Sequence, residues 1–231
     1  MSLNSKLFEL YNAYWPALLD FGRSIGDPHP TAPLLLSVDE ARISQADKII
    51  MICGQETWGW NSFGSSIEDG MALYHRFFTN GEFYEGYGVS SFWKAFRFFK
   101  ANLASVYSGQ KLEFVWQNIS KIGRNDEHTG VTDVIRLLER QYFPVFKEEM
   151  NLIQPDMILF LTGPDRDHDI QFHFPDAKFH QTGNENNLRR RAWVESSNLP
   201  RASLRLYHPS YYRAWTTSYK NEAVSLLEEK A

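Results

Sequence analysis

Four short apolar runs, separated by segments with the spacing of amphipathic helices, limit the possible folds of this chain more than any other feature. The clearest run is PDMILFLTGP, Pro155 to Pro164, which proline punctuates at both ends. KIIMICG, Lys48 to Gly54, is rich in isoleucine and ends in glycine, as expected for a strand buried on both faces. Lys111–Ser120 and Ala202–Ser210 are further candidates. These runs predict the strands of a buried sheet.

Helical patterns occupy the intervals between these runs. Apolar residues recur at helical spacing from Leu7 to Leu19, and Ser90 or Ser91 is placed to cap the amphipathic segment that follows. A helix over 130–153 is expected in two pieces around Pro144, and another closes the chain. Strands that alternate with helices are typical of a parallel sheet covered on both faces.

We therefore predict an α/β fold, a three-layer α/β/α arrangement around a central parallel sheet of about four strands. Residues 1–231 are expected to form a single domain, because no low-complexity segment or linker divides them. The pattern breaks over 61–89 and again over 165–200, and both segments are expected to be loops.

Composition and charge exclude several classes of protein. The net charge of −4 argues against a globally basic nucleic-acid-binding surface but leaves a local basic face open. The single cysteine, Cys53, excludes an internal disulfide and an all-cysteine metal or iron–sulfur site. The first residues lack the pattern of a signal peptide, and no apolar run approaches the roughly 20 residues that span a bilayer. We expect a soluble, cytoplasmic protein with no membrane partner.

Polar and aromatic side chains follow the predicted strands. Gln55, Glu56 and Trp58 come after the first strand, Asn118 comes at the end of the second, and His208 comes at the end of the fourth. Ligands of such sheets bind at the carboxyl ends of the strands. An acid, amides and an imidazole are therefore expected to meet in one pocket.

The order of these motifs resembles the uracil-DNA glycosylase superfamily, whose members carry Gly-Gln-Asp-Pro-Tyr-His after the first strand and His-Pro-Ser-Pro-Leu after the last. Here the first motif is GQETWG, Gly54 to Gly59, and the last is HPSYY, His208 to Tyr212. Asn118 stands where the family has an asparagine, and the resemblance covers most of the chain from Lys48 to the end. The chain departs from the family at Glu56, one methylene longer than aspartate, and at the two tyrosines of the last motif.

The resemblance implies a role for each residue. Glu56 would stabilise the sugar cation or hold the attacking water, and His208 would donate to the departing base. Asn118 would read the base edge with its amide, which offers a donor and an acceptor. Gln55 and Trp58 would also line the base pocket. An aromatic residue is expected to stack on the base, and its candidates are Phe63, Phe77 and Phe78.

An arginine-rich stretch extends the resemblance to DNA. Between Asn187 and Arg213 lie six arginines and one acid, with tyrosines and a tryptophan interleaved. Such a stretch can contact phosphates and stack on bases, although it can also be a solvated connection. The residues expected to contact DNA are Ser90, Ser210, Tyr212, Arg213, Arg189, Arg190 and Arg191.

Each candidate also has a structural interpretation. Glu56 could cap the following segment, Asn118 could serve a turn, and His208 could be a structural histidine. Three aspartates lie near two histidines in Asp165–Phe174, but their spacing matches no defined metal site, so no metal is expected.

The leading hypothesis is a cofactor-independent DNA glycosylase that releases uracil or a related damaged base. The alternative is a catalytically silent relative that binds a nucleobase, a nucleotide or a protein partner. The acidic net charge and Glu56 favour that alternative.

Overall fold

The structure, a computed structural model, describes residues 1–82, 87–126, 128–183 and 186–230. Its residues group into two compact units, between which the chain passes several times. Unit 1 comprises Met1–Glu40, Gln55–Glu82 and Asn118–Ile153. Unit 2 comprises Ala41–Gly54, Phe83–Gln117 and Gln154–Ala231. The single domain over 1–231 remains a prediction.

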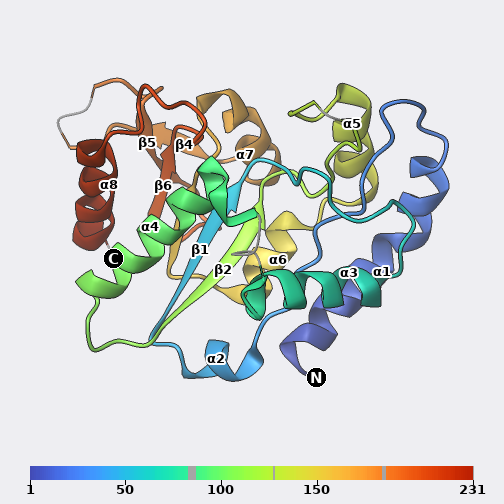
Figure 1. The fold of residues 1–231 in the computed structure, drawn as a ribbon, viewed down its shortest axis with the longest axis horizontal. Helices are drawn as coiled ribbons and strands as arrows, with labels where there is room; N and C mark the ends of the chain where they lie inside the picture. The colour runs from blue at the N-terminus through green and yellow to red at the C-terminus, as the bar shows by residue number, and fades with distance from the viewer. Residues whose placement is uncertain (83–86, 127, 184–185, 231) are drawn as a thin grey trace. The chain divides into compact units, whose positions relative to one another are not determined.

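A six-stranded sheet in the order β2-β1-β3-β6-β5-β4 lies in unit 2, apart from its residue Asn118 (Figure 1). Its strands are β1 (Lys48–Gly54), β2 (Leu112–Asn118), β3 (Met157–Phe160), β4 (Lys178–His180), β5 (Arg191–Glu195) and β6 (Ala202–Leu206). The pairs β1–β3 and β3–β6 are parallel, whereas β6–β5 and β5–β4 are antiparallel. The sheet is therefore mixed but mostly parallel.

The central strands are apolar because both of their faces are covered. All four residues of β3 are buried, and Cys53 of β1 pairs in register with Phe160 of β3. Phe160 in turn pairs with Arg205 of β6, which is only 1% exposed. The strands β1, β3 and β6 all end at the same edge, where Gly163 N donates to the Leu206 carbonyl at 2.9 Å.

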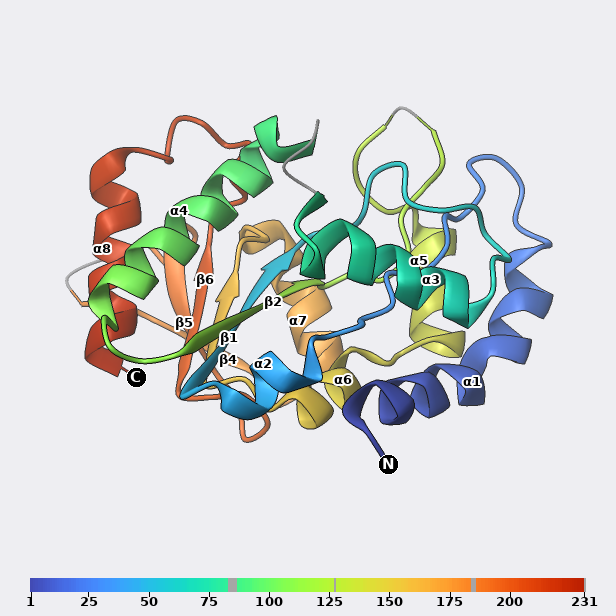
Figure 2. The same ribbon diagram turned by 60° about the horizontal axis from the view of Figure 1, so that its bottom comes forward.

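Helices of unit 2 flank this sheet. They are α2 (Glu40–Gln45, all but its first residue in this unit), α4 (Ser91–Val106), α7 (Asp167–His173) and α8 (Thr217–Lys230), with short 3₁₀ turns η3 (Tyr87–Val89) and η4 (Pro164–Arg166). The helices α4 and α8 lie side by side, and α8 contacts β6 (Figures 1 and 2). Phe99 of α4 packs edge-on against Trp215, which packs edge-on against Tyr219 of α8. This aromatic chain stabilises the packing of the two helices.

Unit 1 is built from helices α1 (Leu3–Gly22), α3 (Ile67–Tyr74), α5 (Asp133–Tyr142) and α6 (Phe146–Ile153), with a π-helical turn η1 (His75–Thr79). The helix α1 contacts the other three α-helices. Its fully buried Tyr11 donates to Glu149 Oε1 at 2.6 Å and accepts from Leu36 N at 2.9 Å. Lys121 Nζ lies 2.9 Å from the same Glu149 oxygen, and both side chains are fully buried. A satisfied ionic network therefore occupies the core of this unit.

The prediction of an α/β protein whose sheet is flanked by helices is confirmed. The strand Lys48–Gly54 has the predicted bounds, and α4 begins at Ser91 with the Ser90 hydroxyl accepting from Trp93 N at 3.2 Å. The helix over 130–153 divides around Pro144, as predicted.

Two expectations about loops were wrong. The segment 61–89 contains α3, η1 and η3, and the segment 165–200 contains α7 and the strands β4 and β5. The sheet consequently has six strands and is mixed, instead of having about four parallel ones. The added strands are short, and two of the three β4 residues are exposed, so they lack the apolar pattern that marks a buried strand. Within the described residues, no helix is long and apolar enough to cross a membrane.

Candidate functional site

The Glu56 carboxylate is held by the backbone of unit 1. Gly130 N donates to Glu56 Oε1 at 2.8 Å, and Ser120 N donates to the Gln55 carbonyl at 2.8 Å. Both Gln55 and Glu56 are partly buried, and Asn118 is only 2% exposed. Three of the predicted site residues therefore lie on two backbone segments that hydrogen-bond to each other.

The segment that follows Asn118 is fixed by a buried carboxylate. Glu139 of α5 accepts from Lys121 N at 2.9 Å and from Ile122 N at 3.1 Å. Gly123 then packs against the 55–57 loop so closely that an added Cβ would lie 2.1 Å from the Thr57 carbonyl oxygen. Only glycine allows this approach, so the position of Glu56 depends on tertiary contacts with residues 120–130.

The aromatic candidates of unit 1 differ in their surroundings. The Phe77 ring in η1 packs edge-on against Trp60, with centroids 5.5 Å apart, and Trp60 follows Glu56 in the same loop. Phe63 packs onto Gly22 of α1 instead, and Phe78 packs against Tyr74. Phe77 is therefore in direct contact with a residue of the loop that carries Glu56. Trp58 is 61% exposed, so it is not part of the core of this unit.

His208 lies in unit 2, in the turn after β6. Its Nδ1 accepts from Ser210 N at 3.3 Å and lies 2.7 Å from the Ser210 hydroxyl. Burial lowers the pKa of His208 to about 4, and the Arg166 charge acts in the same direction. The imidazole is therefore neutral at pH 7. Because a backbone N–H can only donate, Nδ1 is the acceptor and the ring proton resides on Nε2.

The backbone around His208 is fixed from two sides. Trp215 Nε1 donates to the His208 carbonyl at 2.8 Å, as does Tyr211 N at 2.9 Å. Gly163, which follows β3, has a φ of 77°, and an added Cβ would lie 3.3 Å from His208 N. Glycine at this position thus lets the end of β3 approach the His208 turn.

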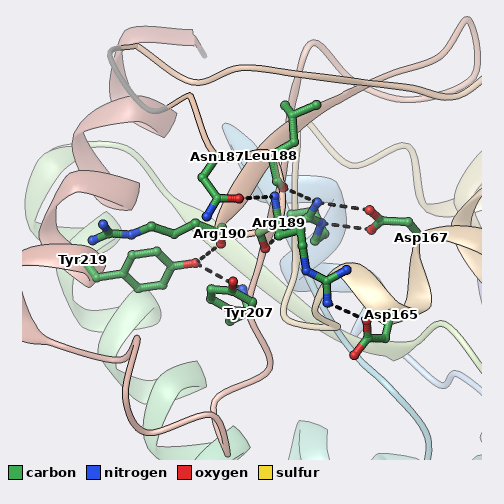
Figure 3. Close-up of polar contacts among 9 residues, drawn as sticks. Asp165, Asp167, Asn187, Leu188, Arg189, Arg190, Tyr207 and Tyr219 are labelled. Atoms are coloured by element: carbon green, nitrogen blue, oxygen red, sulfur yellow. Dashed lines mark hydrogen bonds and ion pairs between the residues drawn. The ribbon is translucent and has the colours of Figure 1, made fainter.

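The arginine-rich stretch begins with a tight turn that Figure 3 shows in detail. Arg189 N donates to Asn187 Oδ1 at 3.0 Å, and Arg190 N donates to the Asn187 carbonyl at 2.9 Å. The Arg189 side chain pairs with Asp165 at 3.0 Å on the surface. The Arg190 carbonyl accepts from Tyr219 Oη at 2.6 Å (Figure 3).

The buried Arg205 side chain stabilises this turn through hydrogen bonds to its backbone. Its guanidinium forms two hydrogen bonds with the Asp167 carboxylate, at 2.9 and 3.0 Å, and donates to the carbonyls of Leu188 and Arg189 at 2.6 and 3.0 Å. Burial raises the pKa of Asp167 above its ordinary value, and the Arg205 charge opposes this shift. Arg205 is therefore a structural residue within the arginine-rich stretch.

The remaining predicted DNA contacts have varied positions in unit 2. Arg191 opens β5, is only 8% exposed, and binds Thr182 Oγ1 at 2.8 Å and Glu222 Oε2 at 2.5 Å. Ser90 caps α4. Ser210, Tyr212 and Arg213 are exposed, and the Arg213 guanidinium lies 6.0 Å from the Tyr212 ring centroid. Three of the exposed residues thus lie in the turn after His208, whereas the exposed Ser90 and Arg189 lie elsewhere in the unit.

Each of the three aspartates of segment 165–174 forms an ion pair with an arginine. Asp165 pairs with Arg189, Asp167 with Arg205, and Asp169 with Arg166 at 3.3 Å. Within the described ranges, no three His, Cys, Asp or Glu side chains gather in a way that could hold a metal ion.

Sequence reasoning missed several residues that position the site. Gly130, Glu139 and Tyr219 act through long-range contacts that no local pattern shows. Gly163 differs from these residues, because its place directly after a predicted strand is visible in the sequence and often marks a tight approach of the backbone.

Fold and site together define the class of the molecule as an α/β protein with a six-stranded, mostly parallel mixed sheet flanked by helices. A scan against models of known protein families matches none of them, and a search of curated proteins also found no match.

Proposed function

We propose that this protein hydrolyses the N-glycosidic bond of uracil or a related damaged base in DNA. The observation that carries the proposal is the state of His208, a neutral imidazole whose proton is on Nε2. A neutral donor suits a leaving base that gains negative charge, because its hydrogen bond strengthens as that charge develops. The proposal includes the finer architecture expected from the resemblance, a three-layer α/β/α fold of the uracil-DNA glycosylase kind.

The proposed reaction is a displacement at the sugar. A water molecule attacks C1′, and the bond from C1′ to the base nitrogen breaks, with its electron pair leaving on the base. His208 Nε2–H donates a hydrogen bond to the base anion. The proton of the attacking water passes to the Glu56 carboxylate, whose Oε1 is oriented by Gly130 N. The products are the free base, which takes up a proton, and an abasic sugar.

The remaining residues are assigned to recognition. Asn118 would bind the base edge, Gln55 and Trp58 would line the base pocket, and Phe77 would stack on the base. DNA would be held through the exposed residues Ser210, Tyr212 and Arg213 together with Arg189 and Arg190. The buried position of Arg191 favours a supporting role within β5 rather than direct phosphate contact.

The test is incubation of the purified protein with single- and double-stranded oligonucleotides that contain one uracil, with the released base quantified by mass spectrometry. We expect release by the wild type and a loss of roughly 10²–10³-fold in His208→Ala, the effect of removing one such donor. His180→Ala is the matched control, because His180 is an exposed histidine on strand β4 of the same unit.

Glu56 has its own pair of variants. Glu56→Gln keeps an oxygen that can accept from Gly130 N but removes the charge, and we expect a loss of roughly 10²–10⁴-fold. Glu56→Asp shortens the side chain to the length typical of the family and reports on the geometry. Absence of base release from both strand forms, or equal release by His208→Ala and wild type, would refute the proposal and favour the silent relative that only binds.

A further inference from the structure

A pocket of about 280 Å³ lies in unit 2 beside the arginine turn. Its lining combines two cationic side chains with hydroxyl, amide and aromatic groups, and it includes Arg190, Arg213, Asn187, Tyr207, Tyr211 and Thr216. None of its described lining residues is acidic. Its described lining residues therefore offer many hydrogen-bond donors to an anion.

The position of the pocket adds to its positive potential. Thr216 directly precedes α8, a helix of 14 residues, and its hydroxyl accepts from Tyr219 N at 3.2 Å. One lining residue of the pocket thus lies at the N-terminal end of this helix, where the helix dipole favours negative charge. Within the described part of the chain, no carboxylate pairs with the exposed Arg213, whose contact is with the Tyr212 ring. Two arginines and a helix N-terminus converge here.

The Arg190 side of the pocket is preorganised. Tyr219 Oη donates to the Arg190 carbonyl at 2.6 Å and accepts from Tyr207 N at 3.1 Å, so one buried hydroxyl joins two lining residues (Figure 3). The Arg190 guanidinium lies 5.3 Å from the Tyr219 ring centroid. A site whose backbone is already ordered loses less entropy when a ligand binds.

Two tyrosines, Tyr207 and Tyr211, line the same pocket as the two arginines. The ring centroids of Tyr207 and Tyr211 lie 4.8 Å apart, and the angle between the ring planes is 53°. Arginines recognise phosphate oxygens, and tyrosine rings pack against sugars and bases. We propose that this pocket binds the phosphate group of a nucleotide, with Arg190 and Arg213 on the phosphate oxygens and the tyrosines against the sugar or base.

The phosphate can belong to a free mononucleotide or to the backbone of single-stranded DNA. The proposed binding shares Arg190 and Arg213 with the DNA contacts proposed above, but it needs neither Glu56 nor the imidazole of His208, so it can be measured separately from base excision. The experiment uses ligands that contain thymine, because the proposed excision acts on uracil or a damaged base. Nucleotide binding is then measured without base release.

The experiment is calorimetric titration of the full chain with 5′-dTMP, with thymidine, and with the oligonucleotide dT4, each at low and at moderate salt. Arg213→Gln and Arg190→Gln are the test variants, and circular dichroism verifies that each is folded. Arg201→Gln is the matched control, because Arg201 is an exposed arginine of the same unit that lies outside this pocket.

We expect the phosphate-bearing ligands to bind at least about tenfold more tightly than thymidine, the effect of one charge-assisted contact. Arg213→Gln should weaken that binding by a similar factor, and Arg201→Gln should not. Binding of dTMP identifies a mononucleotide site, whereas binding of dT4 alone identifies a DNA backbone site. Equal affinity for thymidine and dTMP, binding of neither phosphate ligand, or equal losses in Arg213→Gln and Arg201→Gln would overturn the proposal.

Discussion

Lowering the pH from 7 toward 4 should destabilise the protein through His208. Burial lowers the pKa of His208 from its ordinary 6.5 to about 4 in the folded state. The unfolded chain has the ordinary value, so between these two pKa values the unfolded state binds more protons at this site. The stability that is present above pH 6.5 is therefore lost progressively as the pH falls toward 4.

The two pKa values determine the magnitude of this loss. Proton linkage at a single site gives a decrease in the free energy of unfolding of roughly 2 kcal/mol by pH 5 and roughly 3 kcal/mol by pH 4. Such a change is a large fraction of the stability of a typical domain.

The assay is urea denaturation of wild type and His208→Gln at several pH values from 4 to 7.5. The carboxyl groups titrate in both proteins, so the difference between their free energies of unfolding isolates His208. As the pH falls, the free energy of unfolding of the wild type should decrease relative to that of His208→Gln. The variant His168→Gln controls for the removal of a histidine elsewhere in unit 2. Parallel pH profiles for wild type and His208→Gln, or an NMR titration of the His208 ring near pH 6.5, would refute the reasoning.

Three further predictions concern the residues that position the site. Gly123→Ala places a Cβ 2.1 Å from the Thr57 carbonyl, so we expect about 1–3 kcal/mol of destabilisation and weaker base release, measured by urea denaturation and the excision assay; unchanged values for both would contradict this. Gly163→Ala, at a φ of 77°, should cost about 1–2 kcal/mol and shift the His208 ring resonances, and an unchanged NMR spectrum would argue against the contact. Lys121→Met leaves the Glu149 charge buried and should cost about 3–5 kcal/mol, largely recovered in Lys121→Met/Glu149→Leu; failure of the double variant to recover stability would show that the ion pair is not the cause.

Local signals in the sequence were sufficient for several elements. The strand Lys48–Gly54 is a continuous apolar run that ends in glycine, and Ser90 is a typical N-cap before an amphipathic helix. Pro144 lies between α5 and α6, as expected for a residue that has no backbone N–H to donate within a helix. Each of these features depends on residues that are close to one another in the sequence.

The sequence alone did not predict the antiparallel half of the sheet. The strands β4 and β5 are short and partly polar, and they exist because β5 pairs with β6 and β4 with β5. Arg191 and Arg205 belong to a stretch that resembles a basic surface, yet both are buried and pair with carboxylates distant in sequence, Glu222 and Asp167. Charge counted along the chain cannot show which arginines are neutralised.

The sequence determined which residue types follow each strand, because Glu56, Asn118 and His208 all stand directly at or after apolar runs. Only the tertiary structure decided their chemical state. Glu56 is oriented by Gly130 N, and His208 is kept neutral by burial and by the charge of Arg166. Desolvation and hydrogen bonding arise from atoms that folding brings together across dozens of residues, so no local pattern in the sequence encodes them.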